Sequence, residues 1–412
     1  MENPKIRFKG FTKDWEQRKL SEITTMHARI GWQNLRTSEF LDSGDYMLIT
    51  GTDFNDGAIN YSTCHFVERE RYEQDKHIQI KNGSILITKD GTLGKVAYVQ
   101  GLSMPATLNA GVFNVEIKDE TEVNDKYLFQ YLKAPFLMDY VNKKATGGTI
   151  KHLNQNILVD FPVFMPSKAE QEEIGTYFEK LDNLITLHQR KCEQTKKLKK
   201  YMLQKMFPRN GAKVPEIRFY GFTYDWEQRK LGEVCSRVQG NDGRMDLPTL
   251  TISAANGWMN QEDRFSGNIA GKEQENYTLL HKGELSYNHG NSKLAKYGTV
   301  FSLQSYKEAL VPRVYHSFKV EEGSPDFLEY YFATKLPDRE LGKLISSGAR
   351  MDGLLNIGYN EFMGIQMLFP SVEEQKQISN YFRNLDHLIT LHQRKCDELK
   401  KMKKYMLQNM FI

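Results

Sequence analysis

The chain has few cysteines, and their spacing does not suit a metal site. Four occur in 412 residues, and no two form a CxxC pair, which argues against a disulfide framework or a zinc cluster as the organising feature. No apolar run approaches the roughly 18 residues that a membrane span needs, and the amino terminus is charged from Glu2, unlike a signal peptide. These absences predict a cytoplasmic protein with no membrane contact. The four cysteines are Cys64, Cys192, Cys235 and Cys396.

Sequence signatures of catalysis are missing as well. The stretch 91–96 has neither the spacing nor the Ser/Thr of a phosphate-binding loop. There is no Asn/Asp-Pro-Pro-Tyr/Phe methyltransferase motif and no HExxH. Carboxylates such as Asp119 and Glu120, near Lys126, resemble a nuclease site only by chance. The sequence therefore predicts a noncatalytic protein with no cofactor or metal of its own.

Length and charge leave several classes of protein open. A chain of 412 residues exceeds what one hydrophobic core usually organises, so two or three domains are expected. The net charge of +4 neither requires nor excludes a polyanionic partner. Lysines crowd the stretches 196–205 and 400–404, and we interpret most of them as the solvated faces of helices.

One long stretch occurs twice. LDNLITLHQRKC, residues 181–192, returns 204 positions later as LDHLITLHQRKC, residues 385–396, with eleven of twelve letters unchanged. Apolar residues recur along both copies with helical period, and residues 169–207 contain no proline and one glycine. This pattern predicts two helices of about 35 residues, roughly 50 Å each.

A helix of that length needs a partner along its course. Its own copy is the economical partner, which predicts an intramolecular two-helix coiled coil; two separate surface helices are the alternative. The predicted seam includes His188 and His392, which we interpret as packed polar residues that fix register rather than as ligands. Its other members are Ile174, Phe178, Leu181, Leu184, Ile185, Cys192, Thr195, Leu198, Met202 and Met206, repeated as Ile378, Phe382, Leu385, Leu388, Ile389, Cys396, Leu399, Met402, Met406 and Met410.

A second block is duplicated ahead of each variable region. IRFKGFTKDWEQRKL from Ile6 reappears as IRFYGFTYDWEQRKL from Ile217, with thirteen of fifteen letters unchanged. Trp15 and Trp226 give the two copies an aromatic anchor, which we expect to dock each block on the scaffold rather than to contact a ligand. The chain is thus a tandem repeat of block, variable region and long helix.

The two variable regions, 21–165 and 232–369, share almost no sequence but keep common landmarks. A glycine turn leads into an alternating strand, an amphipathic helix follows, and then a loop with a basic residue. Each region is therefore predicted to be one α/β domain of the same fold. The matched pairs are 82–87 with 282–287, 125–132 with 326–332, and 147–151 with 347–351.

This layout resembles the specificity subunit of type I restriction-modification enzymes over the whole chain. The resemblance rests on NGSILITKDGTLGK at 82–95, GGTIKHLNQN at 147–156, and both duplicated helices. In the second domain, the corresponding stretches contain different residues, namely GELSYNHGNSKLAKYG at 283–298 and SSGARMDGLLNIGYN at 346–360.

The resemblance implies an α/β (α+β) fold. Two similar target recognition domains would be separated by two long antiparallel helices that form the coiled coil, related by a pseudo-twofold axis. It divides the chain into a first block with recognition domain (1–165), a central helix (166–210), a second block with recognition domain (211–369) and a C-terminal helix (370–412).

The resemblance also implies a function. Each domain would read one half of a split site on double-stranded DNA, and partner subunits would methylate and cleave. The assembled complex would be an adenine-specific DNA methyltransferase and a type I site-specific deoxyribonuclease, used in defence against foreign DNA. Two methyltransferase subunits and the restriction subunits are the expected partners, and S-adenosylmethionine, ATP and magnesium are expected on them rather than on this chain.

The residues expected to meet DNA lie in glycine-bounded loops. Arg or Lys can pair with guanine and Asn with adenine, whereas other basic groups hold phosphates; for each residue a structural or phosphate role competes evenly with base reading. The candidates are Lys89, Asp90, Thr92, Lys95, Lys151 and His152 in the first domain, and Asn288, His289, Asn291, Ser292, Lys293, Arg350 and Asp352 in the second.

Polar helix positions that are unchanged between the copies are candidates for binding the methyltransferase subunits. A seam that needed only to be apolar would tolerate exchange among aliphatic residues, although recent duplication also explains the identity. Two other functions stay open: a protein-binding scaffold with two modules, and a single-chain DNA-modifying enzyme with an unrecognised site. The partner candidates are Thr186, Gln189, Arg190, Thr390, Gln393 and Arg394.

Overall fold

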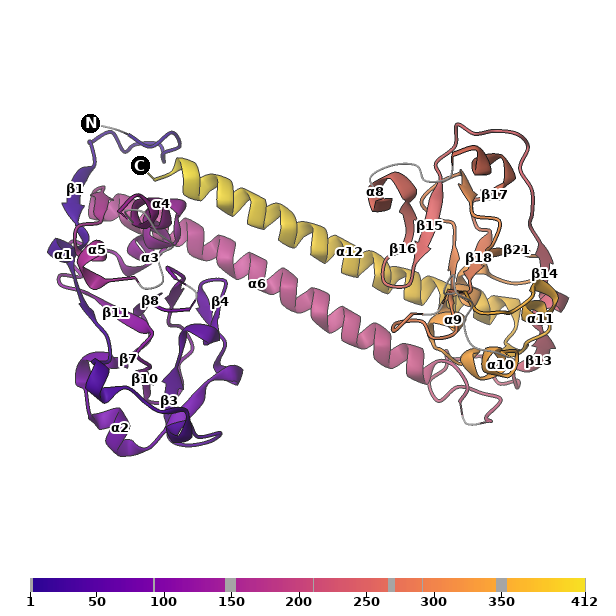
Figure 1. Ribbon diagram of the computed structural model, residues 1–412, viewed down its shortest axis with the longest axis horizontal. Coiled ribbons are helices and arrows are strands. Elements are labelled where there is room, and N and C mark those ends of the chain that lie inside the picture. Colours follow the sequence, from indigo (N-terminus) through magenta and orange to yellow (C-terminus); the bar gives the residue numbers. More distant parts are fainter. Residues whose placement is uncertain are drawn as a thin grey trace. The chain divides into compact units, whose positions relative to one another are not determined.

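The computed structural model describes residues 3–91, 93–144, 153–209, 211–265, 271–290, 292–345 and 354–411. It divides into two compact units, one made of residues 1–189 with 394–412 and the other of residues 190–393 (Figure 1). Two long helices, α6 (Lys168–Lys205) and α12 (Val372–Asn409), contribute to both units. Each has 38 residues, which corresponds to roughly 57 Å. Both predicted long helices are thereby confirmed.

The first unit contains two four-stranded sheets. One has the order β2-β11-β8-β9 and the other β6-β3-β10-β7. The strands are β1 (Glu16–Lys19), β2 (Thr24–His27), β3 (Tyr46–Ile49), β4 (Phe54–Asn55), β5 (Ala58–Ile59), β6 (His65–Val67), β7 (Gln79–Ile80), β8 (Ile85–Thr88), β9 (Val96–Tyr98), β10 (Ala106–Leu108), β11 (Val112–Ile117) and β12 (Pro162–Met165). The shorter helices are α1 (Leu20–Ile23), α2 (Arg69–Glu73), α3 (Asp125–Lys133), α4 (Pro135–Lys144) and α5 (Gln155–Val159).

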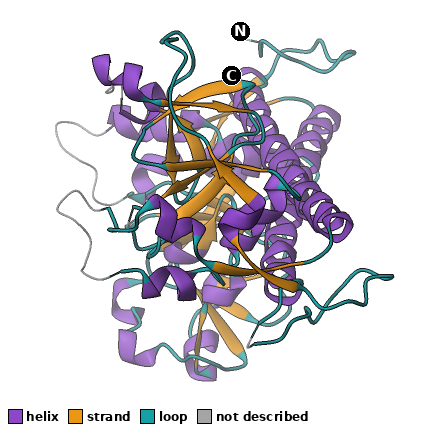
Figure 2. Cartoon of the chain, turned by 90° about the vertical axis from the view of Figure 1, so that its right-hand side faces the viewer, coloured by secondary structure: helices purple, strands orange, loops and turns teal. Residues whose placement is uncertain are grey.

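The second unit repeats the strand order of the first. Its main sheet runs β14-β21-β18-β19, and β13 pairs with β22 as β1 pairs with β12. This unit faces the viewer in Figure 2, with strands in orange and helices in purple. The strands are β13 (Glu227–Lys230), β14 (Cys235–Arg237), β15 (Leu250–Ser253), β16 (Gly257–Asn260), β17 (Thr278–His281), β18 (Leu285–Asn288), β19 (Thr299–Ser302), β20 (Glu308–Val311), β21 (His316–Val320) and β22 (Gln366–Phe369). The shorter helices are α7 (Leu231–Val234), α8 (Gln261–Phe265), α9 (Pro325–Ala333), α10 (Asp338–Lys343) and α11 (Tyr359–Met363).

The shared landmarks occupy equivalent elements, so the prediction of one fold for both domains is confirmed. Gly83 and Gly283 both have a φ of about +90° and turn the chain into β8 and β18. The amphipathic stretches form α3 and α9. The third landmark pair, 147–151 and 347–351, lies outside the described residues.

The duplicated blocks dock on the helices through the same two contacts. Trp15 is 3% exposed and packs edge-on against Tyr127, and Trp226 is 1% exposed against Phe327. The aromatic anchors are therefore core residues, as predicted.

An arginine of each block also holds the first turn of a long helix. The Arg7 guanidinium donates to both carboxylate oxygens of buried Glu170, at 2.6 and 2.8 Å. Arg218 does the same to Glu374, at 2.8 Å for both contacts. A two-pronged contact of this kind fixes the direction of each helix relative to its block.

Within each unit, the segments of α6 and α12 pack antiparallel with one register. Lys403 Nζ lies 2.6 Å from a carboxylate oxygen of Asp182 in the first unit, and Lys199 Nζ lies 2.6 Å from Asp386 in the second. These pairs are equivalent under the 204-residue repeat. The predicted antiparallel pairing of the helix with its copy is thus present.

The predicted seam was partly wrong. Ile174, Phe178, Leu181 and Cys192 are buried as expected, and so are their second copies. However, four positions assigned to the seam are 41–48% exposed, because a two-helix contact buries a narrower stripe than the apolar pattern covers. These four are Leu184, Leu198, Leu388 and Met402.

The end of each long helix completes a core built by distant residues. Phe411, just after α12, is 3% exposed and stacks on Phe178 at 5.6 Å in the first unit. Phe207, just after α6, is 1% exposed and lies 5.7 Å from Phe327 in the second. The first core is therefore incomplete without the last residues of the chain.

Replacing Phe411 by Ala should lower the free energy of unfolding of the first unit by about 3–5 kcal/mol, because an aromatic ring is removed from a close-packed core. Urea denaturation gives the size of the loss, and amide hydrogen exchange in α3 locates it. Phe265→Ala is the matched control, because Phe265 is 43% exposed and should cost about 0.5 kcal/mol or less. If amide exchange became faster in α9 but did not change in α3, the assignment of Phe411 to the core of the first unit would be contradicted.

Lys403 should make stability depend on alkaline pH. Burial lowers its pKa from 10.5 to about 8, and the nearby Lys133 adds to this, although Asp182 opposes it. The folded pKa lies below the unfolded one, so between about pH 8 and 10.5 the unfolded chain binds more protons. The free energy of unfolding should therefore rise with pH across this window, by as much as about 3 kcal/mol.

The contribution of Lys403 is isolated by subtracting the stability-against-pH curve of Lys403→Met from that of the unchanged protein. Lys199→Met, the same change at the equivalent and more exposed position, should keep the rise because Lys403 remains. A flat difference curve for Lys403→Met would refute the lowered pKa.

Candidate nucleic-acid interface

The loop from Lys89 to Lys95 in the first domain is anchored at both ends. It leaves β8, whose four residues are all buried. The Lys95 amide donates to Thr88 Oγ1 at 3.0 Å, and the Lys89 amide donates to the Gly111 carbonyl at 2.9 Å. These bonds fix where the loop begins and ends, so the side chains between them are presented from a rigid base.

The two predicted lysines of this loop are placed differently. Lys89 is half-buried, and its Nζ lies over the Phe113 ring, 5.5 Å from the centroid. Lys95 is exposed, and Asp90 is half-buried. Gly94 has a φ of +70°, a backbone conformation that favours glycine, and a Cβ there would displace the Met138 side chain. The loop can therefore offer Lys95 to a ligand without rearrangement.

In the second domain, two predicted DNA contacts turn inward. Asn288 accepts from the Gly290 amide at 3.0 Å and donates to the Ile252 carbonyl at 3.2 Å. His289 is 6% exposed, and its ring nitrogens lie 2.7 Å from the Leu355 carbonyl oxygen and 2.9 Å from that of Val314. These contacts tie the loop base to neighbouring segments, so they are structural contacts.

His289 also stacks on His316, with ring centroids 4.9 Å apart. The pKa of His316 is lowered to about 4, mainly by burial and also by the neighbouring His289 and Arg237, although a hydrogen bond to the Ile357 carbonyl opposes these effects. His316 is therefore neutral at physiological pH and adds no charge to the domain.

The outward residues of this loop are Ser292 and Lys293, both exposed. They begin a turn in which the amide of Ser292 donates to Ala295 and that of Ala295 donates back, at 3.1 and 3.2 Å. Leu294 in the same turn is 67% exposed. Leu294 was not among the sequence-based candidates, because these were chosen as polar side chains that can read bases. The position of Leu294 between two lysines was the signal in the sequence.

Six of the sequence-based candidates lie outside the described residues. They are Thr92, Lys151, His152, Asn291, Arg350 and Asp352.

All six partner-binding candidates are exposed on the long helices, as an interface requires. Thr390 Oγ1 donates to the Asp386 carbonyl at 2.9 Å, and Arg394 lies 3.7 Å from Glu398. Thr186 and Gln189 line a cavity of about 250 Å³ between α6, α3 and the β4–β5 hairpin. The set is Thr186, Gln189, Arg190, Thr390, Gln393 and Arg394.

Apolar side chains accompany these polar positions. Leu184 and Leu187 are each 43% exposed on α6, and Leu388 is 41% exposed on α12. Tyr201 and its copy Tyr405 are 49% and 57% exposed. Exposed apolar side chains thus recur at two pairs of repeated positions, Leu184 with Leu388 and Tyr201 with Tyr405.

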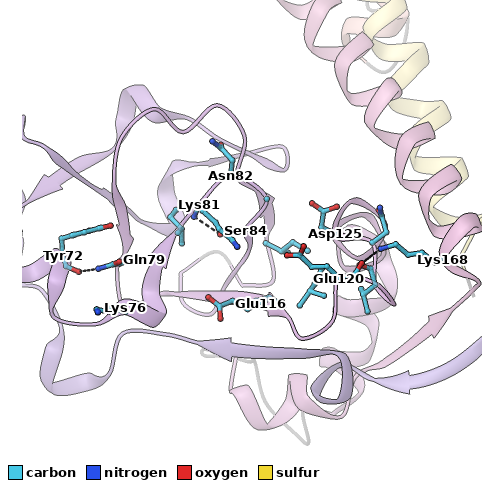
Figure 3. A pocket seen from close by; sticks show the side chains of 17 residues that line it. Tyr72, Lys76, Gln79, Lys81, Asn82, Ser84, Glu116, Glu120, Asp125 and Lys168 are labelled. Carbon is cyan, nitrogen blue, oxygen red and sulfur yellow. Dashed lines mark hydrogen bonds between the residues drawn. The ribbon is translucent and has the colours of Figure 1, made fainter.

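A cavity of about 800 Å³ lies in the first domain (Figure 3). Tyr72 and Lys76 lie at one side of it and Asp125 at the other, near Lys168. Lys168 Nζ donates to the carbonyl oxygens of Glu120 and Val123, and Asp125 accepts from the Tyr98 hydroxyl. Its lining mixes Lys76, Lys81 and Lys168 with Glu116, Glu120 and Asp125, so it lacks the uniformly basic lining of a DNA groove.

Other features bear on the remaining predictions. All four cysteines are free and buried, and burial raises the pKa of Cys64 and Cys235 to about 12, so neither thiol is reactive. Within the described ranges, no three His, Cys, Asp or Glu side chains gather as metal ligands. The helices among those residues include none that is both long and apolar enough for a bilayer.

Comparison with known proteins identifies the first half of the chain directly. Residues 12–197 match the family model described as the type I restriction modification DNA specificity domain.

Two relatives from Methanocaldococcus jannaschii extend the match. The type I restriction enzyme MjaVIII specificity subunit is 25% identical over 358 residues, 81% of this chain and 79% of the relative. The MjaIX specificity subunit is 25% identical over 246 residues, 56% of this chain and 54% of the relative. The alignment thus spans about half the length of MjaIX and about four fifths of MjaVIII.

The fold has a solved counterpart. The S subunit of a type I restriction-modification system from M. genitalium superposes with a TM-score of 0.64, covering 100% of this chain and 99% of that one at 14% identity. The arrangement of two α/β domains with long helices is therefore shared. Over most of its length the chain is therefore similar to specificity subunits of type I restriction enzymes, and residues 12–197 match the DNA specificity domain of that family.

Proposed function

We propose that this chain reads a DNA site in two halves, one half by each variable domain, and directs partner subunits to methylate and cleave. The observation that carries the proposal is a common strand order, β2-β11-β8-β9 and β14-β21-β18-β19, that bears unrelated loops. A common frame places different side chains at corresponding points. Two such domains in one chain suit a site with two different halves.

The corresponding loops differ in both length and residues. The β8–β9 connection comprises residues 89–95 and the β18–β19 connection residues 289–298, three more. We assign Lys95 and Lys293, both exposed, to phosphates or base edges, since lysine serves both. Lys89, Asp90 and Ser292 belong to the same surfaces. The six candidates outside the described residues stay part of the proposal.

The long helices are proposed to bind two methyltransferase subunits, one per repeat. The supporting observation is that polar and apolar residues alike are exposed at repeated positions, Leu184 with Leu388 and Tyr201 with Tyr405. Leucine side chains exposed on a helix are in contact with water, and their burial against a partner protein is favourable. A surface that occurs twice in one chain binds two copies of one partner.

The remaining parts of the system follow from this assembly. Restriction subunits join the complex of this chain with the methyltransferase. The partner subunits bind S-adenosylmethionine, ATP and magnesium, and this chain contributes recognition. The complex works in the cytoplasm, where its four free cysteines stay reduced.

Exchanging residues 21–165 for the first domain of another specificity subunit should change one half of the methylated site and leave the other half unchanged. The reason is that the exchanged residues include the β8–β9 loop and leave the β18–β19 loop intact. Long-read sequencing of genomic DNA from cells that carry the chimera and the methyltransferase reads both halves. The reciprocal exchange of residues 232–369 is the matched control. A chimera in which both halves change would refute separate reading.

Changing Arg190 and Arg394 to Glu should remove methyltransferase copies in steps. Each single change reverses one charge on one repeat of the exposed face, so each single variant should bind one partner copy and the double variant none. Native mass spectrometry of the purified complex counts the copies. Lys9→Glu, an equal charge reversal at an exposed residue that is not part of either long helix, should keep both. A double variant that still binds two copies would exclude these arginines from the interface.

A further inference from the structure

Leu294 is displayed to solvent in a way that leucine seldom is. At 67% exposed, it presents more of itself than Leu388 or Met402 on the long helices. It stands in the β18–β19 loop, between Lys293 and Lys296, which are also exposed. An aliphatic side chain held in water loses the stabilisation that burial would bring. Its position therefore needs an explanation.

The turn that carries Leu294 is rigid, so the exposure is built in. The reciprocal backbone bonds between Ser292 and Ala295 close the turn, and Ser292 Oγ accepts from the Ala295 amide at 3.1 Å. Ala295 is 2% exposed and anchors the turn in the domain. Below it, the Tyr287 hydroxyl donates to the Tyr297 carbonyl at 2.7 Å. Leu294 is thus held outward by a fixed support.

The equivalent loop of the first domain buries its leucine instead. Leu93 lies in the shorter β8–β9 loop and is partly buried against the main core of that unit. The second loop has three more residues than the first, and its leucine is exposed. Exposure of Leu294 is therefore specific to one domain and is not a property of the shared frame.

The chemistry around Leu294 selects the ligand. The loop sequence HGNSKLAKYG contains two lysines and no acidic residue, so the surroundings suit a phosphate-bearing partner. On DNA, the apolar feature available to such a side chain is the C5-methyl group of thymine, which projects into the major groove. Lysines on both sides can hold the backbone while the leucine meets the methyl group.

We propose that Leu294 recognises a thymine methyl group in the half-site read by the second domain. This inference rests on the proposed function, because it requires that the domain reads DNA. Leu294 is then a specificity-determining residue that acts by apolar contact, in addition to the polar candidates of the same loop.

The test uses the complex of the full chain with its methyltransferase. The second half-site is first taken from the methylated motif in cells. Duplexes are then made in which each thymine of that half-site, on either strand, is replaced singly by deoxyuridine, which lacks only the methyl group. Fluorescence anisotropy at one fixed salt concentration gives the Kd of the unchanged protein, Leu294→Ala and Leu294→Gln on every duplex.

One deoxyuridine position should weaken binding by the unchanged protein about fourfold, the factor for one methyl-sized contact at about 0.8 kcal/mol. Leu294→Ala should bind the thymine duplex about fourfold more weakly than the unchanged protein does. Its Kd should not change when that thymine is replaced by deoxyuridine. Leu294→Gln, which keeps the side-chain length, should behave alike. Met245→Ala, a change at a 41% exposed residue of the same unit, should keep the full deoxyuridine effect.

The possible failures are distinct. If the unchanged complex binds none of the duplexes and the cells carry no methylated motif, the proposed function itself fails. If it binds but Leu294→Ala still senses the same deoxyuridine, or loses affinity equally on every duplex, the methyl contact is overturned. A half-site with no thymine on either strand overturns it as well. Melting temperatures close to that of the unchanged protein confirm that the variants are folded, as expected for an exposed side chain.

Discussion

The pairing of a helix with its own duplicate is the constraint on which the rest of this structure depends. The first compact unit is not a continuous stretch of chain, because it combines residues 1–189 with residues 394–412. The second, residues 190–393, is continuous and includes the end of α6 and the start of α12. Aromatic residues make this dependence strong, because Phe411 and Phe207 fill cores assembled by residues far away in sequence. Contacts of such long sequence separation close large loops, so the first unit completes its core late in folding.

Charge pairs reinforce this pairing and set its register. Lys403 is 7% exposed beside Asp182, and burial lowers its pKa despite the facing carboxylate. A buried pair of this kind contributes little net stability, because desolvation offsets the attraction. It does penalise any other register, which would leave an ammonium buried alone. The same logic applies to Glu170, which is 1% exposed and pairs with Arg7. We interpret these duplicated pairs as devices of specificity rather than of stability.

The strand order shared by the two domains allows their loops to differ. Strands such as β8 and β18 are buried and have the same place in equivalent sheets, so changes in them are costly. The loops that follow are fixed mainly by backbone hydrogen bonds and by glycines, which depend little on the side chains at the tip. A seven-residue and a ten-residue loop are therefore carried by one architecture. This separation of support from surface is what allows one fold to present different recognition residues.

Much of the architecture followed from the sequence alone. The duplicated helix, the duplicated block and the turn-strand-helix landmarks depend on local periodicity and on repetition, which are written in the chain, and the family resemblance rests on the same features. Which apolar residues of the helix are covered did not follow: Leu184 and Leu388 match the seam pattern but lie exposed, because a two-helix contact covers only a narrow stripe. The local sequence pattern also did not show which loop side chains would be buried and which would be exposed. Asn288 and His289 look like base-reading groups until tertiary structure brings the Ile252, Leu355 and Val314 carbonyls to them. Leu294 looks like a core residue until a rigid turn holds it in solvent. Repetition and period thus determined the elements, whereas burial of individual side chains was decided by which distant segments pack together.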